Sequence, residues 1–473
     1  MVCLNKEEYL KIIIDEEYKL LTEIIKNGEL KEYRKLIEIF DGERELLLQM
    51  FNDSPLEIYN HIFLDYLKVV HDISLLVPGL STGLKDGKNN ITIYTYNGKT
   101  KENGASVSEN TRFDLASITK LFTAIMALKL AEDGKFDFDK LVSDYKKYPN
   151  LNIKVENMVK FNYELKTDGR LDDNVSLEEL LRRLRLTKIV KDNTFIYSDI
   201  PFIILKDILN CSDKYFEEYF NEEMKLFDTS YDRSFGDLTG GIASEINLVN
   251  DLKARNFEKY NLYPGHAGIF STSKDLIKLF DNLNSFLSHD SIIKMITPII
   301  NTPFLYNHDN TFSYDIKGVK RISRAMGVYY KHPEGIRVNE MANPLSKEAF
   351  AIAGFTGTWA CFDLMNGLSS NFLANPFSRS KDAVIDEKFE VLNDYGTVKV
   401  DGKTIQIFDS ENIIDTIPFT RITNVLKEES IYTLLKLRFA KKVLERKAVL
   451  EQSSVLKNEI VKVFETEKII RRV

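Results

Sequence analysis

The first 72 residues carry apolar positions at the spacing of amphipathic helices. From residue 8 to about residue 26 the apolar side chains recur every three or four positions, and Asn27-Gly28 follows as a typical helix stop. A second helical pattern covers residues 30–40. A third opens at Ser54-Pro55, a capping serine followed by proline at the first helical position. We therefore predict an N-terminal helical extension over residues 1–72, which serves packing or homo-oligomerisation; a recognition role is the alternative.

The pattern changes at Val77-Pro78-Gly79, after which apolar and polar residues alternate. The segments LSTGL and NITIYTY lie on either side of Asp86-Gly87, which is typical of a β-hairpin. From about Leu115 to about residue 325 the pattern is mostly helical. Strand-like segments then return at AFAIAG, TGTWACFD and LSSNFLAN. We predict an α+β multidomain chain: an antiparallel sheet flanked by helices, with an all-α insertion over about 115–325 and a cleft where sheet and insertion meet.

The central domain is expected to cover residues 73–375, followed by a C-terminal α+β extension over residues 376–473. That extension opens with a second hairpin signal, TVKVDGKTIQIF, again containing Asp-Gly. Two helices are predicted after it, from Glu429 to about Glu451 and from Ser454 to about Ile470.

Composition and charge narrow the function. The 473 residues are 44% hydrophobic and 29% charged, as in a globular protein, and the net charge of −7 offers no attraction to a nucleic acid backbone. No apolar run approaches the roughly 18 residues of a membrane span. The three cysteines lie far apart, so neither a disulfide framework nor a metal cluster is expected, and a reducing, cytoplasmic location fits best. No metal or other cofactor is predicted.

Serine chemistry without histidine is the remaining catalytic option, because no Gly-x-Ser-x-Gly, Walker or dinucleotide motif is present. Ser-x-x-Lys occurs six times, and by itself it carries little information. Only Ser117 and Lys120 lie in an apolar helix directly after a sheet segment. There, serine and lysine one helical turn apart would let the amine take the hydroxyl proton, provided that burial lowers the lysine pKa.

At this point the sequence resembles the penicillin-recognising serine hydrolases, in the class C β-lactamase-like branch that also contains DD-peptidases, D-aminopeptidases and esterases. The matching segments follow in the family's order: LVPGLSTGLKDGK, NTRFDLASITKLFTA, FIYSDIPFIIL, NDLKA, GHAGIFSTSKDLIKLF and AGFTGTWACFD. The resemblance implies that Ser117 is the acylated nucleophile and Lys120 its proton acceptor. Tyr197 of Tyr197-Ser198-Asp199 matches the tyrosine that relays the proton to the leaving group.

Two motifs depart from the family pattern. The second often ends in Asn, whereas here it ends in Asp199, a variant associated with the esterase-like members. The third is usually Lys-Thr-Gly or His-Thr-Gly, whereas here the aligned residues are Ile352-Ala353-Gly354. A group that holds a substrate carboxylate is therefore missing, but the strand backbone remains. The N–H groups of Ser117 and Phe355 can still form an oxyanion hole.

The substrate-binding residues expected from this resemblance are Asp199, Gly354, Phe355 and His266. For His266 a second interpretation stays open, in which its loop only leads into the next helix, with Ser271 or Thr272 as the N-cap. The acidic and basic residues of NDLKA, Asp251 and Lys253, are expected to form an ion pair at the floor of the cleft.

The sequence thus predicts a cytoplasmic serine hydrolase that acts through an acyl-enzyme on an ester or amide, supplied by a small molecule or a peptide. A DD-peptidase or β-lactamase is the alternative within catalysis. It is disfavoured by the altered third motif and by the absence of an export signal. A non-catalytic binding protein that keeps the fold is the alternative outside catalysis.

Overall fold

The computed structural model describes residues 77–101, 103–145, 147–192, 196–211, 213–240, 248–299, 325–330 and 345–376, together with short segments at 313–314, 320–321, 390–393, 396–401, 404–409, 412–418 and 430–437 in part. The predicted extension over residues 1–72 and most of the two predicted C-terminal helices lie outside the described residues. At the start of the first of these helices, five buried residues are described as helical: Ser430, Ile431, Thr433, Leu434 and Leu437.

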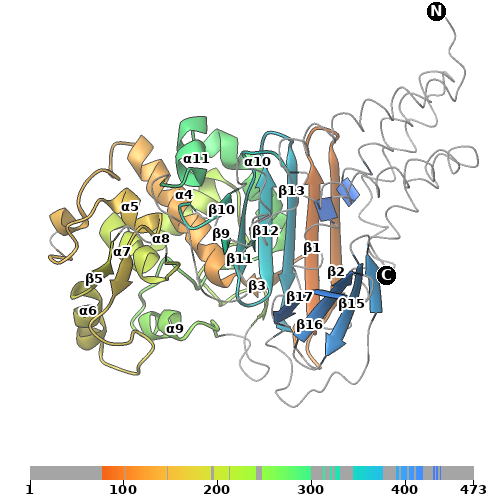
Figure 1. Ribbon diagram of the computed structural model, residues 1–473, viewed down its shortest axis with the longest axis horizontal. Helices are drawn as coiled ribbons and strands as arrows, with labels where there is room; N and C mark the ends of the chain where they lie inside the picture. Colours follow the sequence, from red (N-terminus) through yellow and green to blue (C-terminus); the bar gives the residue numbers. More distant parts are fainter. Residues whose placement is uncertain are drawn as a thin grey trace, which may run out of the picture.

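The central feature is a six-stranded antiparallel sheet in the order β10-β11-β12-β13-β1-β2 (Figure 1). This sheet brings together segments that are far apart in the sequence. Strand β1 pairs with β13, and Leu80 lies opposite Ala374. The five predicted strands are confirmed, and β10 is a further strand that the sequence pattern did not indicate. The bounds are β1 Gly79–Asp86, β2 Ile91–Gly98, β10 Tyr329–Tyr330, β11 Phe350–Gly354, β12 Thr358–Asp363 and β13 Leu368–Ala374.

The hairpin predicted at Asp86-Gly87 is present, but its turn is longer than the two-residue turn typical of that signal. Asp86 pairs with Ile91, which leaves four residues between the strands. The carboxylate of Asp86 accepts N–H groups from Lys88 at 3.1 Å and Asn89 at 3.3 Å, and Asn90 takes the left-handed conformation (φ 53°). The aspartate therefore acts as an acceptor that holds a four-residue turn.

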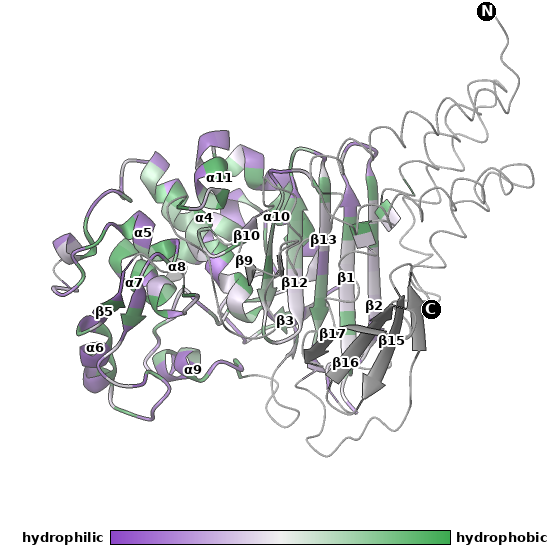
Figure 2. Cartoon of the chain, in the orientation of Figure 1, coloured by the Kyte–Doolittle hydropathy of each residue, from purple (hydrophilic) through white to green (hydrophobic). Residues whose placement is uncertain are grey.

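Helices cover one side of this sheet, and α4 lies at their centre (Figure 1). Eleven residues of α4 are buried, which explains its mostly apolar sequence, whereas α6 lies at the outside and is largely hydrophilic (Figure 2). Helix α10 packs on β1 and β13. The helices are α4 Thr119–Glu132, α5 Val155–Val159, α6 Leu177–Arg185, α7 Ile200–Leu209, α8 Asp213–Glu218, α9 Leu252–Glu258, α10 Ser273–Phe286 and α11 His289–Ile296.

The insertion is not all-α as predicted, because it contains small sheets. Two strands of the insertion, β6 Asp237–Thr239 and β7 Phe270–Ser271, pair with β3 Thr111–Asp114, which directly precedes it. The order is β6-β3-β7, with β6 parallel and β7 antiparallel to β3. Two further pairs are β4 Glu164–Lys166 with β5 Lys188–Lys191, and β8 Ser313–Tyr314 with β9 Lys320–Arg321. Strands of two to four residues are too short to produce a recognisable alternation, so the sequence pattern did not indicate them.

The C-terminal part contains a separate four-stranded antiparallel sheet in the order β14-β15-β16-β17. The predicted second hairpin is confirmed by β15 Gly396–Asp401 and β16 Thr404–Asp409, and the other strands are β14 Glu390–Asn393 and β17 Asn412–Pro418. Among the described residues, no helix has the length and apolar character needed to cross a membrane.

Candidate active site

Ser117 lies in a short 3-10 turn, Ala116–Ile118, between strand β3 and helix α4. Leu115 and Ile118 on either side are fully buried and anchor the turn, while Ser117 itself is half-buried. Ala116, directly before it, has a φ of +45°, a left-handed backbone conformation that residues other than glycine rarely adopt. The turn therefore holds a partly accessible serine on a tightly constrained backbone.

Lys120 lies in the first turn of α4, and its side chain is fully buried. Its Nζ atom is 2.9 Å from Ser117 Oγ, 2.8 Å from Asp199 Oδ1 and 3.3 Å from the carbonyl oxygen of His266. Three acceptors thus match the three hydrogens of an ammonium group. The structure brings Ser117 and Lys120 together as the spacing predicts.

Tyr197 completes the group around the serine. Its hydroxyl lies 3.0 Å from Ser117 Oγ, and its ring centre lies 5.1 Å from Lys120 Nζ. The ring also packs against Phe161, with centroids 5.1 Å apart. Ser117 Oγ is therefore within hydrogen-bond distance of both an amine and a phenol, the arrangement that the resemblance implies.

Asp199 is the N-cap residue of α7, and its carboxylate lies between two lysines. Oδ1 is bound to Lys120, and Oδ2 lies 3.0 Å from Lys253 Nζ. Burial alone would raise the pKa of Asp199, but attraction to Lys120 and the other cationic groups outweighs it and holds this pKa far below its usual range. Asp199 is therefore a carboxylate in the resting protein.

This ion pair changes the expected state of Lys120. Burial alone would lower the pKa of Lys120, but the nearby Asp199 and Tyr197 raise it above its ordinary value. The sequence-based expectation of a neutral lysine with a lowered pKa is therefore wrong for the resting protein. That expectation took account of the burial of Lys120 but not of the carboxylate of Asp199, which lies 79 positions further along the chain.

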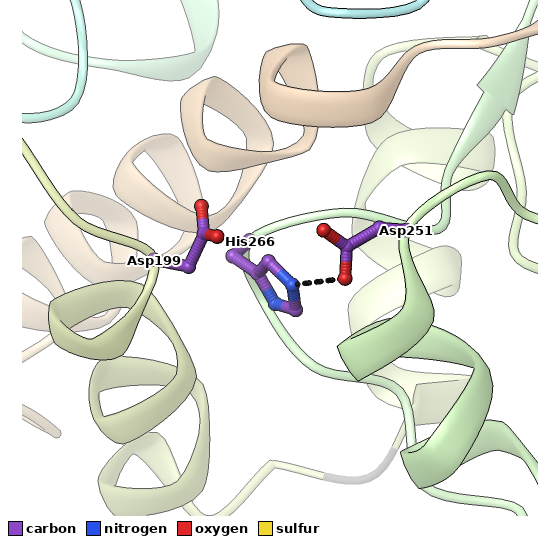
Figure 3. A group of neighbouring side chains, drawn as sticks. All are labelled: Asp199, Asp251 and His266. Carbon is purple, nitrogen blue, oxygen red and sulfur yellow. Dashed lines mark hydrogen bonds and ion pairs between the residues drawn. The ribbon is translucent and has the colours of Figure 1, made fainter. Parts of the chain in front are cut away.

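The predicted ion pair at the floor of the cleft belongs to the same network. Lys253 Nζ is 3.9 Å from Asp251 Oδ2, and Asp251 Oδ1 is 3.0 Å from His266 Nε2 (Figure 3). Asp251 also caps α9 by accepting the N–H of Ala254 at 2.9 Å. These side chains thus form a chain of contacts from His266 through Asp251 and Lys253 to Asp199 and Lys120.

The structure places His266 in the buried part of this network. Its side chain is only 1% exposed, because its ring turns inward to Asp251. Its loop also leads into α10, where Thr272 is the N-cap and accepts the N–H of Asp275 at 3.2 Å. The role expected for Asp199 changes in the same way, because both of its oxygens bind lysines rather than facing a substrate.

Gly354 ends β11 directly against the nucleophile turn. A Cβ atom at this position would lie 2.5 Å from the carbonyl oxygen of Leu115 and 2.2 Å from Thr358 Oγ1, so only glycine fits. Phe355, the next residue, is 43% exposed. Ile352 is fully buried within the apolar core. The third motif thus offers no polar side chain at Ile352 and keeps the close approach of the strand to the serine.

Sequence reasoning missed the hydroxyl groups that hold the strand and the turn together. Thr356 Oγ1 donates to the carbonyl oxygen of Asp114 at 2.7 Å, and Thr358 Oγ1 donates to that of Leu115 at 3.2 Å. The only signal was their place in the GFTGT segment, because nothing in the sequence indicates which carbonyl groups a threonine meets.

Asp199, Asp251 and His266 could be considered as metal ligands, because one ligand atom from each lies within 4.8 Å of the others (Figure 3). However, the two carboxylate oxygens of Asp199 already bind the ammonium groups of Lys120 and Lys253. A divalent cation would have to enter beside both positive charges, which disfavours binding. We therefore interpret these residues as a charge network.

A family model described as Beta-lactamase matches residues 77–393. The chain is similar in structure to the penicillin binding protein from Bacillus halodurans, with 18% identity and a TM-score of 0.49, over 67% of this chain and 96% of that chain. It is also similar to the class C beta lactamase from Rhodobacter sphaeroides (17% identity, TM-score 0.46, 67% and 94% covered). A third similar structure is EstCE1, a hydrolase with promiscuous acyltransferase activity. It has 15% identity and a TM-score of 0.48, over 67% of this chain and 95% of that chain. No protein with a curated description matches the sequence. Since the family model covers more than half of the 473 residues, this chain belongs to the beta-lactamase family of serine hydrolases.

Proposed function

We propose that this protein hydrolyses an ester or amide through an acyl-enzyme formed on Ser117. One observation carries the proposal: Ser117 Oγ lies 2.9 Å from Lys120 Nζ and 3.0 Å from Tyr197 OH. A serine is a weak nucleophile unless a neighbouring group takes its proton as it attacks. These two contacts supply both the proton acceptor and the path by which the proton reaches the leaving group.

The proton balance involves Lys120 and Tyr197 as a pair. With Lys120 held as an ammonium by Asp199, the pair has to lose one proton before it can accept the proton of Ser117. The positive charge of Lys120 stabilises a phenolate at Tyr197. Tyr197 is half-buried whereas Lys120 is fully buried, so the tyrosine is the more accessible of the two. We therefore assign Tyr197 as the group that takes the serine proton and Lys120 as the charge that makes this transfer favourable.

Attack by Ser117 Oγ on the substrate carbonyl forms a tetrahedral oxyanion, which the N–H groups of Ser117 and Phe355 bind. The short approach of Gly354 to Leu115 supports this assignment, because it brings the end of β11 next to the turn that carries the serine. Tyr197 then returns the proton to the leaving group, and the acyl-enzyme remains. Water then gives a proton to Tyr197 and attacks the acyl carbon. As the bond between the acyl carbon and Ser117 Oγ breaks, Tyr197 returns this proton to Oγ, which restores Ser117 and releases the acid.

An ester with no carboxylate beside the scissile bond is the substrate class that fits best. Ile352 is fully buried where a Lys or His would bind a carboxylate, and exposed Phe355 adds apolar surface. β-Lactams and cell-wall peptides carry such a carboxylate, so β-lactamase and DD-peptidase activity are the less favoured alternatives. A cytoplasmic location and association through the terminal extensions are further parts of the proposal.

Labelling with a fluorophosphonate followed by mass spectrometry tests the proposal. We expect the label on Ser117 and turnover of a short-chain aryl ester, both lost in Ser117→Ala. Ser291→Ala is the matched control, because Ser291 also precedes a lysine by three positions but lies in α11, where Lys294 pairs with Glu156 at 3.3 Å. Labelling elsewhere with Ser117 unmodified, or full turnover by Ser117→Ala, would contradict the mechanism.

A further inference from the structure

The backbone directly before the nucleophile is held in a conformation that needs support. Ala116 has a φ of +45°, and its side chain is fully buried. A residue other than glycine keeps such a conformation only where its surroundings hold it in place. The orientation of Ser117 therefore depends on the groups that bind the N–H of Ala116.

That N–H donates to the carboxylate of Asp114, which is fully buried at the end of β3. Asp114 Oδ1 accepts the N–H of Ala116 at 2.9 Å, and Oδ2 accepts the N–H of Asn250 at 2.9 Å. Asn250 immediately precedes Asp251, which caps α9 and binds His266. One carboxylate thus connects the turn that carries the nucleophile with the segment that carries part of the charge network.

The backbone of Asp114 is fixed in turn. Its carbonyl oxygen accepts the hydroxyl of Thr356 at 2.7 Å, and its Cα pairs with Phe270 of β7. A Cβ atom on Gly240 would lie 2.9 Å from the Cβ atom of Asp114, so the side chain is closely packed on that side. The main chain of Asp114 is therefore held by two contacts, and its side chain is closely packed on the side of Gly240.

We propose that Asp114 is a positioning residue for the reaction: its carboxylate holds the strained turn at Ala116, and thereby Ser117, in register with the Asp251–Lys253 segment. Asp114 does not touch the substrate and acts only through these two backbone contacts. The inference rests on the proposed function of Ser117. It predicts that losing the second acceptor oxygen misplaces the nucleophile, which lowers the rate of acylation more than the binding of substrate.

Asp114→Asn is the direct test, because the amide keeps the shape of the side chain but has only one acceptor oxygen for two N–H donors. We expect kcat for an aryl ester to fall at least about tenfold with KM within about twofold, at a temperature where circular dichroism shows a folded protein. The rate of fluorophosphonate labelling of Ser117 should fall by the same factor.

Asp363→Asn is the matched control. Asp363 is also fully buried and also accepts two backbone N–H groups, from Ser346 at 2.7 Å and Asn366 at 3.1 Å, but it lies at the opposite end of β12 from Thr358. We expect Asp363→Asn to lower the melting temperature while kcat and the labelling rate stay within about twofold of the wild type. Equal losses in the two variants, or an unchanged kcat in Asp114→Asn, would overturn the proposal.

If Asp114→Asn does not fold, Thr356 provides a second test. Thr356→Val removes the hydroxyl that binds the Asp114 carbonyl while keeping the volume, and Thr356→Ser keeps the hydroxyl. Loss of kcat in the valine variant with recovery in the serine variant supports the proposal, and equal kcat in both contradicts it. A wild-type protein with neither turnover nor label on Ser117 would instead refute the proposed function, so the two failures can be told apart.

Discussion

Asp199 Oδ1 lies 2.8 Å from Lys120 Nζ, so the buried lysine beside Ser117 faces a carboxylate of the segment Tyr197-Ser198-Asp199. The pair keeps Lys120 charged despite its full burial. In the proposed mechanism the Lys120–Tyr197 pair must lose a proton. The enzyme is then active only at a pH high enough to remove this proton despite the attraction of Asp199.

Asp199→Asn should shift the pH dependence of kcat to lower pH. In the folded protein Asp199 raises the pKa of Lys120, so removing its negative charge lowers the pKa of the pair and populates the active form at lower pH. We expect the apparent pKa on the acidic side of the kcat profile to fall by about one unit or more. Asp207→Asn is the control, since Asp207 binds Lys147 and Tyr148 in a similar cluster at the other end of α7. An unchanged or higher apparent pKa in Asp199→Asn would contradict this account.

Lys120→Ala should lower kcat nearly as much as Ser117→Ala. The variant also leaves Asp199 with Lys253 as its remaining lysine partner, so we expect it to lose stability, by less than the roughly 3–5 kcal/mol typical of removing one member of a buried pair. The double variant Lys120→Ala/Asp199→Asn separates the two effects. It should recover part of the free energy of unfolding in urea but none of the turnover, and recovery of both would remove Lys120 from the mechanism.

The sequence predicted the sheet and the proximity of Ser117 and Lys120 for different physical reasons. The strands of the large sheet are five to eight residues long, apart from β10, and short turns carrying Gly and Asn separate the later ones, so the sequence indicates them. Ser117 and Lys120 are one helical turn apart, and this local spacing is fixed by the helix. The charge of Lys120 is different, because it depends on Asp199, which tertiary folding brings close. The burial of His266 and the bond between Thr356 and Asp114 are likewise products of tertiary structure.

Hydrolysis of β-lactams should be slow relative to short-chain esters. The ring carboxylate of a cephalosporin needs a cation or hydroxyl at the third motif, and Ile352 and Ala353 offer neither. The ratio of kcat/KM for an aryl ester to that for a chromogenic cephalosporin measures this preference, and faster turnover of the cephalosporin would contradict it. Restoring a lysine by Ile352→Lys is expected to fail as a gain of function. Ile352 is fully buried in the core, so the new ammonium would be desolvated there.

Tyr197→Phe distinguishes a working hydrolase from a binding protein that keeps the fold. The phenol oxygen lies 3.0 Å from Ser117 Oγ, whereas the ring packs on Phe161, a contact that phenylalanine retains. Loss of the hydroxyl should therefore lower kcat by about 10² to 10⁴ with little change in the free energy of unfolding. In a binding protein Tyr197 is only an aromatic wall of the cleft, and the same change leaves ligand affinity and stability nearly unaltered.

The pH profile of this variant gives the second measurement. In the wild type, kcat should rise with pH through an apparent pKa that belongs to the Lys120–Tyr197 pair. In Tyr197→Phe that titration reports Lys120 alone, so the apparent pKa should change along with kcat. Tyr163→Phe serves as the control, because Tyr163 is likewise half-buried and packs against the same core. An undiminished kcat with an unchanged pH profile in Tyr197→Phe would exclude the phenol as the proton carrier and leave Lys120 as the group that accepts the serine proton directly.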